Sequence, residues 1–251
     1  MTITYQPLKL PSLGQFYDGK IPDGLAEVRY FTTREEELLG RGGDARLMIN
    51  QLLAACVRLP GNFPPDDLLI TDRMATLLAV RILSYGSSYT FRYRCAACGE
   101  QTPGTVDLLQ DLPTKHPDPA LTEPIALTLP VTKTEVLARF LRGTDEEAVV
   151  KYAKRMKQAS EGDGDPSSIH RLARQMIKIG GQDRPILERE AIIRELPMAD
   201  TVAFRNTMDE LESGIDLETR PTCKMCGAEN KLQMPFDLEF FRPSSLHAGR
   251  T

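Results

Sequence analysis

Two short cysteine motifs, far apart in the chain, decide the fold that this sequence predicts. The first reads Cys95-Ala-Ala-Cys98-Gly99, and the second reads Cys223-Lys-Met-Cys226-Gly227. A CxxC turn directs both of its sulfur atoms toward one point, and a glycine after it allows a tight turn with positive φ. Two such turns that face each other supply four thiolates in the tetrahedral arrangement that zinc accepts. The sequence therefore predicts one structural Zn²⁺ bound by Cys95, Cys98, Cys223 and Cys226.

The residues beside each motif alternate between apolar and polar side chains, as residues in strands do. This period of two runs through Tyr89–Arg94 before the first motif and through Lys231–Phe236 after the second. We therefore expect each motif to cap an extended segment, as in a zinc ribbon. Because the motifs are so far apart, the ribbon halves at 88–108 and 219–243 are separated by a large insertion, residues 109–218.

A disulfide or redox role for the paired cysteines is less well supported than a metal site. Two surface disulfides would need an oxidising compartment, and a thioredoxin-like redox site uses a single CxxC at a helix N-terminus. The odd cysteine, Cys56, lies in an apolar helical run. We expect it to be a buried core thiol rather than a fifth ligand or a nucleophile.

The composition is that of a globular protein with reduced thiols. Of the 251 residues, 41% are hydrophobic and 26% are charged, and the formal net charge is -4. This acidic balance disfavours a general binder of nucleic acid, which usually carries a basic surplus. No apolar run approaches a membrane span, and residues 1–13 do not form a secretory signal. We therefore expect the chain to fold in a cytosol without membrane contact.

An extended arm is expected at residues 1–25, which are rich in proline and glycine. Its apolar anchors are Leu10, Leu13, Phe16 and Tyr17, which should pack on the protein's own helical domain or on a partner. Composition alone equally allows a disordered terminus.

A small helical domain is expected at residues 26–87, where helix start and stop signals recur. The expected elements are a strand at 26–31, a helix from the capping box of Thr32 and Glu35 to the glycines at 40–43, a helix from the Asp44 cap to Val57, and a helix ended by Gly86.

The insertion at 109–218 also predicts mostly helices, again from capping boxes and glycine stops. The expected elements are a strand at 125–131 and helices at 132–143, 144–159, 169–179, 187–195 and 197–214. The predicted fold class is therefore α+β and mainly α-helical, with a zinc ribbon formed by two distant CxxCG turns around a large helical insertion. Residues 244–251 form a polar tail.

Two adjacent rings, Phe240 and Phe241, follow the second ribbon half. Either they pack back onto the ribbon, or they are exposed and form a docking site, because contiguous exposed apolar surface usually indicates an interface.

Motifs that carry catalysis are absent from the sequence. There is no GxxxxGK[ST], GxGxxG or GxSxG motif. The three histidines, His116, His170 and His247, lie apart from the cysteines, and we expect His116 and His170 at solvated positions. A four-thiolate zinc site has no open position for a substrate. The sequence therefore predicts a protein that is not an enzyme and binds no small-molecule substrate.

Five stretches together resemble a known family. They are Leu10–Tyr17, Val28–Glu37, Asp72–Gly86 with the first cysteine motif, Leu196–Asp200, and the second cysteine motif with Phe240–Pro243. On these stretches the chain resembles the T-even-type bacteriophage baseplate protein family, which covers hub components and hub-assembly chaperones of contractile tails. The family also occurs in phage-derived contractile injection systems.

The resemblance implies a non-enzymatic protein that joins or assists assembly of the baseplate hub. Its implied partners are hub or spike proteins rather than nucleic acid, and its implied place of action is the cytoplasm of the bacterial host during assembly. Whether it stays in the finished particle is left open. A zinc-ribbon protein that binds nucleic acid is the alternative: the basic aromatic run Phe91-Arg-Tyr-Arg94 favours it, and the acidic net charge disfavours it.

Overall fold

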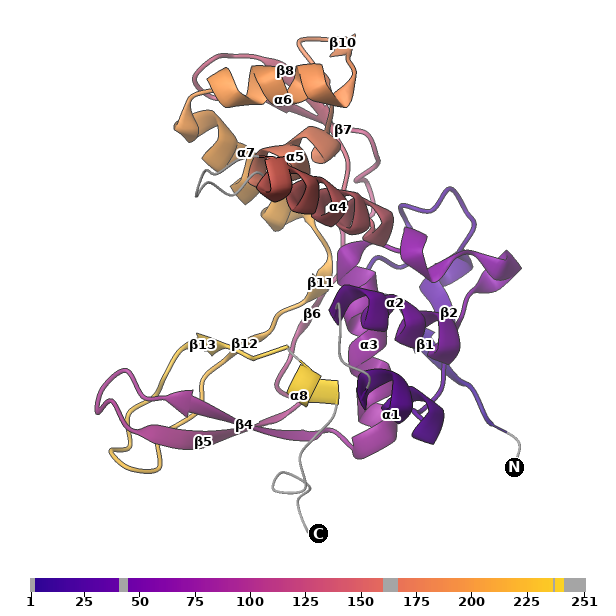
Figure 1. Cartoon of the computed structure of the whole chain (residues 1–251), viewed down its shortest axis with the longest axis vertical. Coiled ribbons are helices and arrows are strands. Elements are labelled where there is room, and N and C mark those ends of the chain that lie inside the picture. The colour runs from indigo at the N-terminus through magenta and orange to yellow at the C-terminus, as the bar shows by residue number, and fades with distance from the viewer. Residues whose placement is uncertain (1–2, 41–44, 160–166, 237, 242–251) are drawn as a thin grey trace.

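The computed structural model is a mixed α+β fold with two lobes and a projecting pair of hairpins (Figure 1). It describes residues 3–40, 45–159, 167–236 and 238–241. The expected Asp44 cap, the polar tail and His247 lie outside these residues. The N-terminal lobe holds α1–α3 and β1–β3, the insertion lobe holds α4–α7 and β7–β10, and the hairpins carry the two cysteine motifs.

Helices and strands are interspersed along the chain. The helices are α1 (Thr33–Gly40), α2 (Ala45–Cys56), α3 (Ile70–Tyr85), α4 (Gly143–Ala159), α5 (Ser167–Gln175), α6 (Ile186–Glu195), α7 (Met198–Leu211) and α8 (Leu238–Phe241), with short 3₁₀ turns at Pro22–Gly24, Pro60–Asn62 and Pro65–Asp67. The strands are β1 (Gln6–Lys9), β2 (Leu25–Val28), β3 (Val57–Arg58), β4 (Ser88–Arg94), β5 (Gln101–Asp107), β6 (Thr114–Lys115), β7 (Ile125–Thr128), β8 (Glu135–Ala138), β9 (Met176–Ile179), β10 (Gln182–Asp183), β11 (Gly214–Ile215), β12 (Glu218–Thr219) and β13 (Leu232–Gln233).

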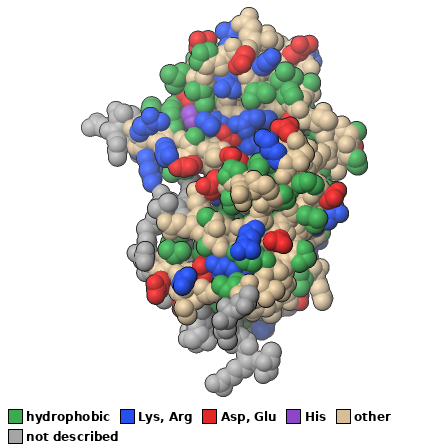
Figure 2. Space-filling view, turned by 90° about the vertical axis from the view of Figure 1, so that its right-hand side faces the viewer, with side chains coloured by type: hydrophobic (Ala, Val, Ile, Leu, Met, Phe, Trp, Pro, Cys, Tyr) green, Lys and Arg blue, Asp and Glu red, His purple; other side chains and the backbone are tan. Residues whose placement is uncertain are grey.

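The surface mixes charges of both signs. On the face shown in Figure 2, basic and acidic side chains are interspersed with apolar ones, and neither sign covers a broad area. Within the described ranges, no helix combines the length and the apolar character needed to cross a bilayer.

Several predicted helix boundaries are confirmed in the N-terminal lobe. α1 follows the capping box, in which the Glu35 carboxylate accepts hydrogen bonds from the Thr32 N–H and hydroxyl, both at 2.7 Å. Desolvation opposes ionisation of Glu35, yet hydrogen bonds from Arg29 and Thr32 lower its pKa to about 2. α3 ends at Gly86, whose φ of 85° suits glycine and whose N–H donates to the Ile82 carbonyl.

The predicted arm is part of the N-terminal lobe rather than a free extension. β1 pairs antiparallel with β2, and β2 pairs with β3, so the arm supplies an edge strand of a three-stranded sheet. Leu10, Phe16 and Tyr17 are buried, whereas Leu13 is half-buried. The prediction that these anchors pack on the protein's own helical domain is therefore confirmed, and the alternative of a disordered terminus is wrong for these residues.

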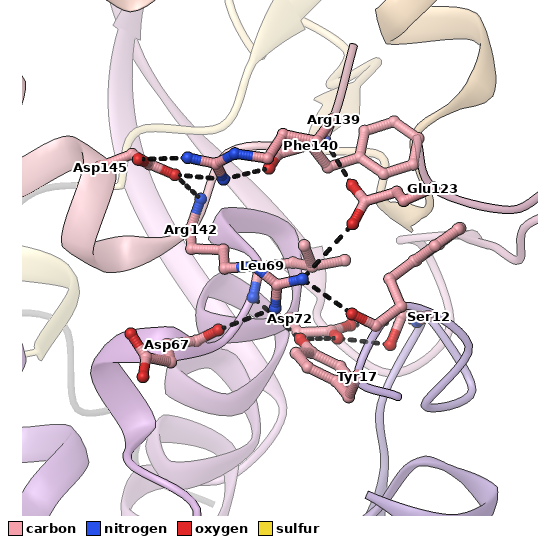
Figure 3. Close-up of polar contacts among 11 residues, drawn as sticks. Ser12, Tyr17, Asp67, Leu69, Asp72, Glu123, Arg139, Phe140, Arg142 and Asp145 are labelled. Carbon is pink, nitrogen blue, oxygen red and sulfur yellow. Dashed lines mark hydrogen bonds and ion pairs between the residues drawn. The ribbon is translucent and has the colours of Figure 1, made fainter. Parts of the chain in front are cut away.

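A buried aspartate on α3 holds this segment in place. Asp72 accepts hydrogen bonds from the Ser12 N–H at 3.0 Å, the Ser12 hydroxyl at 2.5 Å and the Tyr17 hydroxyl at 2.7 Å (Figure 3). The Tyr17 hydroxyl in turn accepts the Leu69 N–H. Burial raises the pKa of Asp72 although Ser12 and Tyr17 donate to it. The carboxylate thus replaces lost hydration with protein donors, as a buried polar group requires.

The insertion lobe contains more strand than the sequence predicts. Its four-stranded antiparallel sheet has the order β10-β9-β8-β7. The expected helix at 132–143 is wrong, because Glu135–Ala138 is the inner strand β8 and Gly143 begins α4 instead of ending a helix. The expected helix at 169–179 stops at Gln175, and Met176–Ile179 forms β9. The helices expected at 144–159 and 187–195 are confirmed as α4 and α6, and the last helix of the insertion, α7, ends at Leu211 rather than near Gly214.

One histidine in this lobe departs from expectation. His170 is buried rather than solvated: its Nδ1 lies 2.5 Å from a Glu190 carboxylate oxygen, and its ring stacks on Tyr152. His116 is exposed as expected.

The two lobes are joined by backbone pairing. β6 and β11 pair antiparallel where the chain enters and leaves the insertion. A second pairing lies beside α3 and α4: the Ile70 N–H donates to the Leu141 carbonyl and the Gly143 N–H donates to the Leu68 carbonyl. These bonds fix the start of α4 against the start of α3.

Arg142 adds side-chain bonds at the same junction. Its guanidinium donates to the carbonyls of Phe16 at 2.8 Å and Asp67 at 3.2 Å, and it pairs with Glu123 at 3.4 Å (Figure 3). Next to it, Asp145 accepts the Arg142 N–H and pairs with Arg139 at 2.7 Å. The N-terminal segment, the 3₁₀ turn before α3 and the insertion lobe are therefore held at one point.

Tyr17→Phe should lower the free energy of unfolding by about 1–3 kcal/mol, because the Leu69 N–H and Asp72 each lose a buried partner. Urea unfolding followed by circular dichroism measures this. The matched control is Tyr30→Phe, since the Tyr30 side chain is exposed. Equal stabilities of the two variants would contradict the role given to Tyr17.

Gly143→Ala should also destabilise the protein, by about 1–3 kcal/mol, because a Cβ there would overlap the guanidinium of Arg73. Arg73 bonds Asp66 at 2.9 Å and is also hydrogen-bonded to Asn50. A double-mutant cycle with Arg73→Ala tests the cause. The cost of Gly143→Ala should shrink in the Arg73→Ala background, and strict additivity would rule the clash out.

Candidate metal centre

The first cysteine motif is the turn of the β4–β5 hairpin. The two strands pair along their whole length, from Ser88 opposite Asp107 to Arg94 opposite Gln101. At the tip, the Cys95 N–H donates to the Glu100 carbonyl and the Gly99 N–H donates to the Cys95 carbonyl, both at 2.9 Å. Gly99 has a φ of 75°, which accounts for the glycine after the second cysteine.

The second cysteine motif repeats this geometry. The Cys223 N–H donates to the Ala228 carbonyl and the Gly227 N–H donates to the Cys223 carbonyl, again at 2.9 Å, and Gly227 also has a φ of 75°. A bridge between Thr222 and Glu229 and the short pairing of β12 with β13 carry this turn. Two sequences with the same CxxCG pattern therefore fold into the same local turn.

The four sulfur atoms converge on one point. All four lie within 4.8 Å of one another, with 3.7 Å between Cys95 and Cys226 and 3.8 Å between Cys98 and Cys223. A tetrahedral metal with bonds of about 2.3 Å places its sulfurs about 3.8 Å apart, whereas a disulfide needs about 2.0 Å. The predicted residues are thus brought together at a spacing that fits a four-coordinate metal, and all four are free thiols.

Backbone amides make this cluster receptive to negative charge. The N–H groups of Cys98 and Ala97 lower the pKa of Cys95 to about 6, and those of Cys226 and Met225 lower the pKa of Cys223. For Cys98 the Glu100 N–H acts in the same direction, but desolvation and the sulfurs of Cys226 and Cys95 raise its pKa to about 12. Once one cysteine is a thiolate, its negative charge opposes ionisation of the other thiols. A bound cation would therefore be required to stabilise four thiolates together.

The cluster has an inner and an outer side. Cys95 and Cys223 are buried, whereas Cys98 and Cys226 are exposed. Among the His, Cys, Asp and Glu side chains of the described part of the chain, these four cysteines are the group close enough together to hold a metal ion. Cys56 is fully buried and lies outside this group, as predicted for a core thiol.

One neighbour of the cluster has no signal in the sequence. Asn230 is buried, and its side-chain N–H donates to the Cys95 sulfur at 3.5 Å. A lone asparagine in a turn region belongs to no periodic or spaced pattern, so only the fold identifies it.

Aromatic packing holds the end of the return chain, the segment from β12 to α8 that carries the second cysteine turn. Phe240 is 0% exposed and Phe241 is 2% exposed. The Phe240 ring packs on Tyr89 of β4 at 5.0 Å and on Phe236 at 4.7 Å, and the Phe241 ring packs on Phe31 at 6.4 Å. The two rings are core residues, so the docking-site interpretation of this pair is wrong.

A comparison with known protein families places the chain. A family model described as T4 bacteriophage base plate protein matches residues 8–242, nearly the whole chain. The protein belongs to this baseplate family. The resemblance seen in the sequence is thereby confirmed, and the match includes both lobes and all four cysteines of the cluster. No curated protein and no solved structure matches the chain.

Phe240→Ala should lower the free energy of unfolding by about 3–5 kcal/mol, because it leaves a cavity among the rings of Tyr89, Phe236 and Phe241. Leu109→Ala is the control, since Leu109 is 68% exposed and its truncation should change stability by less than about 0.5 kcal/mol. Chemical denaturation of both variants measures the difference. If Phe240→Ala were as stable as the wild-type protein, the assignment of the Phe240 ring to the core would be contradicted.

Proposed function

We propose that this protein is a non-enzymatic structural or assembly protein of the baseplate hub, stabilised by a structural zinc site with four cysteine ligands. Membership of the baseplate family over nearly the whole chain carries the proposal. Hub or spike proteins are its proposed partners, and the cytoplasm of the bacterial host is the proposed place of assembly.

The sulfur geometry supports zinc in the role of a cross-link. Four thiolates complete a tetrahedral shell and leave no position for water or substrate, which is typical of structural rather than catalytic zinc. The two CxxCG turns would then act as the facing halves of a zinc ribbon, with the β4–β5 hairpin as one half and the β12–β13 segment as the other.

Such a cross-link would matter because the return chain has little regular structure of its own. β12 and β13 contribute only two residues each, and isolated two-stranded pairs are marginal in water. The metal would join positions 125 and 131 residues apart in the sequence. It would therefore fix the hairpins and α8 beside the N-terminal lobe, and a rigid assembly surface loses less entropy on binding.

The nucleic-acid alternative has little support from the positions of the aromatic residues. Tyr89 and Phe91 of the basic aromatic strand are buried, so they are not available for base stacking, on which single-strand binders rely. Arg92 and Arg94 remain exposed on the opposite face.

Purified protein should contain one zinc per chain, measured by elemental analysis, and X-ray absorption should give four sulfur neighbours at about 2.3 Å. Cys223→Ser should lose the metal and destabilise the fold by on the order of 5 kcal/mol or more, while the helices of the insertion lobe persist in part. Cys56→Ala is the control, because it alters the core but should keep the zinc. Metal-free wild-type protein with full stability would refute the zinc proposal.

The assembly role is tested by co-expression with hub or spike proteins and affinity copurification, with mass spectrometry of purified particles to detect retention. Specific copurification supports the role. Tight binding of nucleic acid in a low-salt gel shift, without any copurifying baseplate protein, would support the alternative instead.

A further inference from the structure

The side chain of Asn230 connects the two cysteine turns directly. Two of its bonds go to the first turn: its Oδ1 accepts the Ala96 N–H at 2.8 Å, and its Nδ2 donates to the Cys95 sulfur at 3.5 Å. The same Nδ2 donates to the Ala228 carbonyl of the second turn at 3.0 Å. The residue is 5% exposed. One amide therefore contacts the backbone of both turns and a sulfur of the cluster.

The orientation of this amide follows from its partners. The Ala96 N–H can only donate, so the atom facing it must be the oxygen, and the NH₂ group must face the sulfur and the Ala228 carbonyl. Both N–H bonds and the oxygen are then used. Asp would lose the donors and add a negative charge beside the sulfurs, and Ala would lose all three bonds.

The backbone of Asn230 is fixed as well, because its N–H donates to the Pro221 carbonyl at 3.1 Å. Pro221 lies against Gly104 of the first hairpin, and the Tyr93 hydroxyl donates to the Pro221 carbonyl at 3.4 Å. The side chain is thus aimed at Cys95 from a rigid frame. An N–H donor held in this way stabilises the Cys95 sulfur as a hydrogen-bond acceptor, and therefore as the thiolate that binds a metal.

We propose that Asn230 is a positioning residue of the metal centre, which joins the two cysteine turns and orients the Cys95 sulfur so that the four-sulfur site is assembled before a metal binds. This rests on the proposed metal site and adds a determinant of its affinity. The consequence is thermodynamic: without the amide, part of the metal's binding energy is used to bring the two turns together.

Cobalt is a suitable probe, because tetrahedral Co²⁺ bound by four thiolates absorbs visible and near-ultraviolet light. Co²⁺ titrations of the full chain in competition with a chelator give the affinity, and Zn²⁺ displacement gives the relative zinc affinity. Asn230→Ala should bind Co²⁺ about 10–100-fold more weakly, the range typical of lost outer-shell partners. Asn230→Asp should lose at least as much, since its carboxylate faces the thiolates.

A spectroscopic signature separates positioning from a general loss of stability. At saturating Co²⁺, the thiolate-to-cobalt charge-transfer band of both variants should move to lower energy, because the sulfur lone pairs have lost a hydrogen-bond donor. Asn206→Ala is the matched control: Asn206 is exposed on α7, and both affinity and spectrum should match wild type. If Asn230→Ala does not fold, Asn230→Asp supplies a second comparison, because it loses the donors to the sulfur but keeps the volume and the acceptor for Ala96.

The outcomes distinguish this inference from the proposal beneath it. Wild-type protein that binds no Co²⁺ or Zn²⁺ would overturn the metal site and the role of Asn230 together. Wild-type binding with unchanged affinity and an unshifted band in both Asn230 variants would overturn the role of Asn230 alone. Weakened binding with a shifted band, absent in the Asn206→Ala control, supports it.

Discussion

Four sulfur atoms must converge from two turns that lie 125 to 131 residues apart in the chain. The remaining architecture is arranged around this constraint. A loop of this length is only slightly more costly to close than a much shorter one, because the closure entropy grows with the logarithm of length. An entire lobe is therefore accommodated between the two cysteine turns, provided that the chain returns to its starting point with defined geometry.

That return is secured at the lobe junction. The pairing of β6 with β11 brings the outgoing and returning chains side by side, and the bonds from Arg142 and the Leu68–Ile70 backbone fix α4 against α3. The charges at this junction are satisfied by protein partners: Asp145 has two arginines, and Asp72 has Ser12 and Tyr17. Buried polar groups that are fully bonded in this way favour one arrangement of the lobes over others, because any shift leaves a donor or acceptor unpaired.

Two apolar segments that the sequence offered as docking sites are used inside the protein instead. The N-terminal segment and the Phe240–Phe241 pair both close the protein's own core. Phe240 and Phe241 pack from behind the cysteine turns onto β4 and the segment before α1. The sulfur cluster therefore holds one part of the return chain, at Cys223 and Cys226, and aromatic packing holds its end, at Phe240 and Phe241.

Sequence alone determined those features whose physical cause is local. The CxxCG turns, the capping box of Thr32 and Glu35, and the helix stop at Gly86 all depend on bonds between residues a few positions apart. The tertiary structure decided whatever depends on distant partners. Thr132 and Glu135 have the same spacing as a capping box, yet Glu135–Ala138 is a strand, because its backbone pairs with β7 on one edge and β9 on the other, and the side chains of Val136 and Ala138 are buried. Likewise, only the folded chain brings Asn230 to Cys95, since nothing in a short window of sequence records which side chain will face a sulfur more than a hundred residues away.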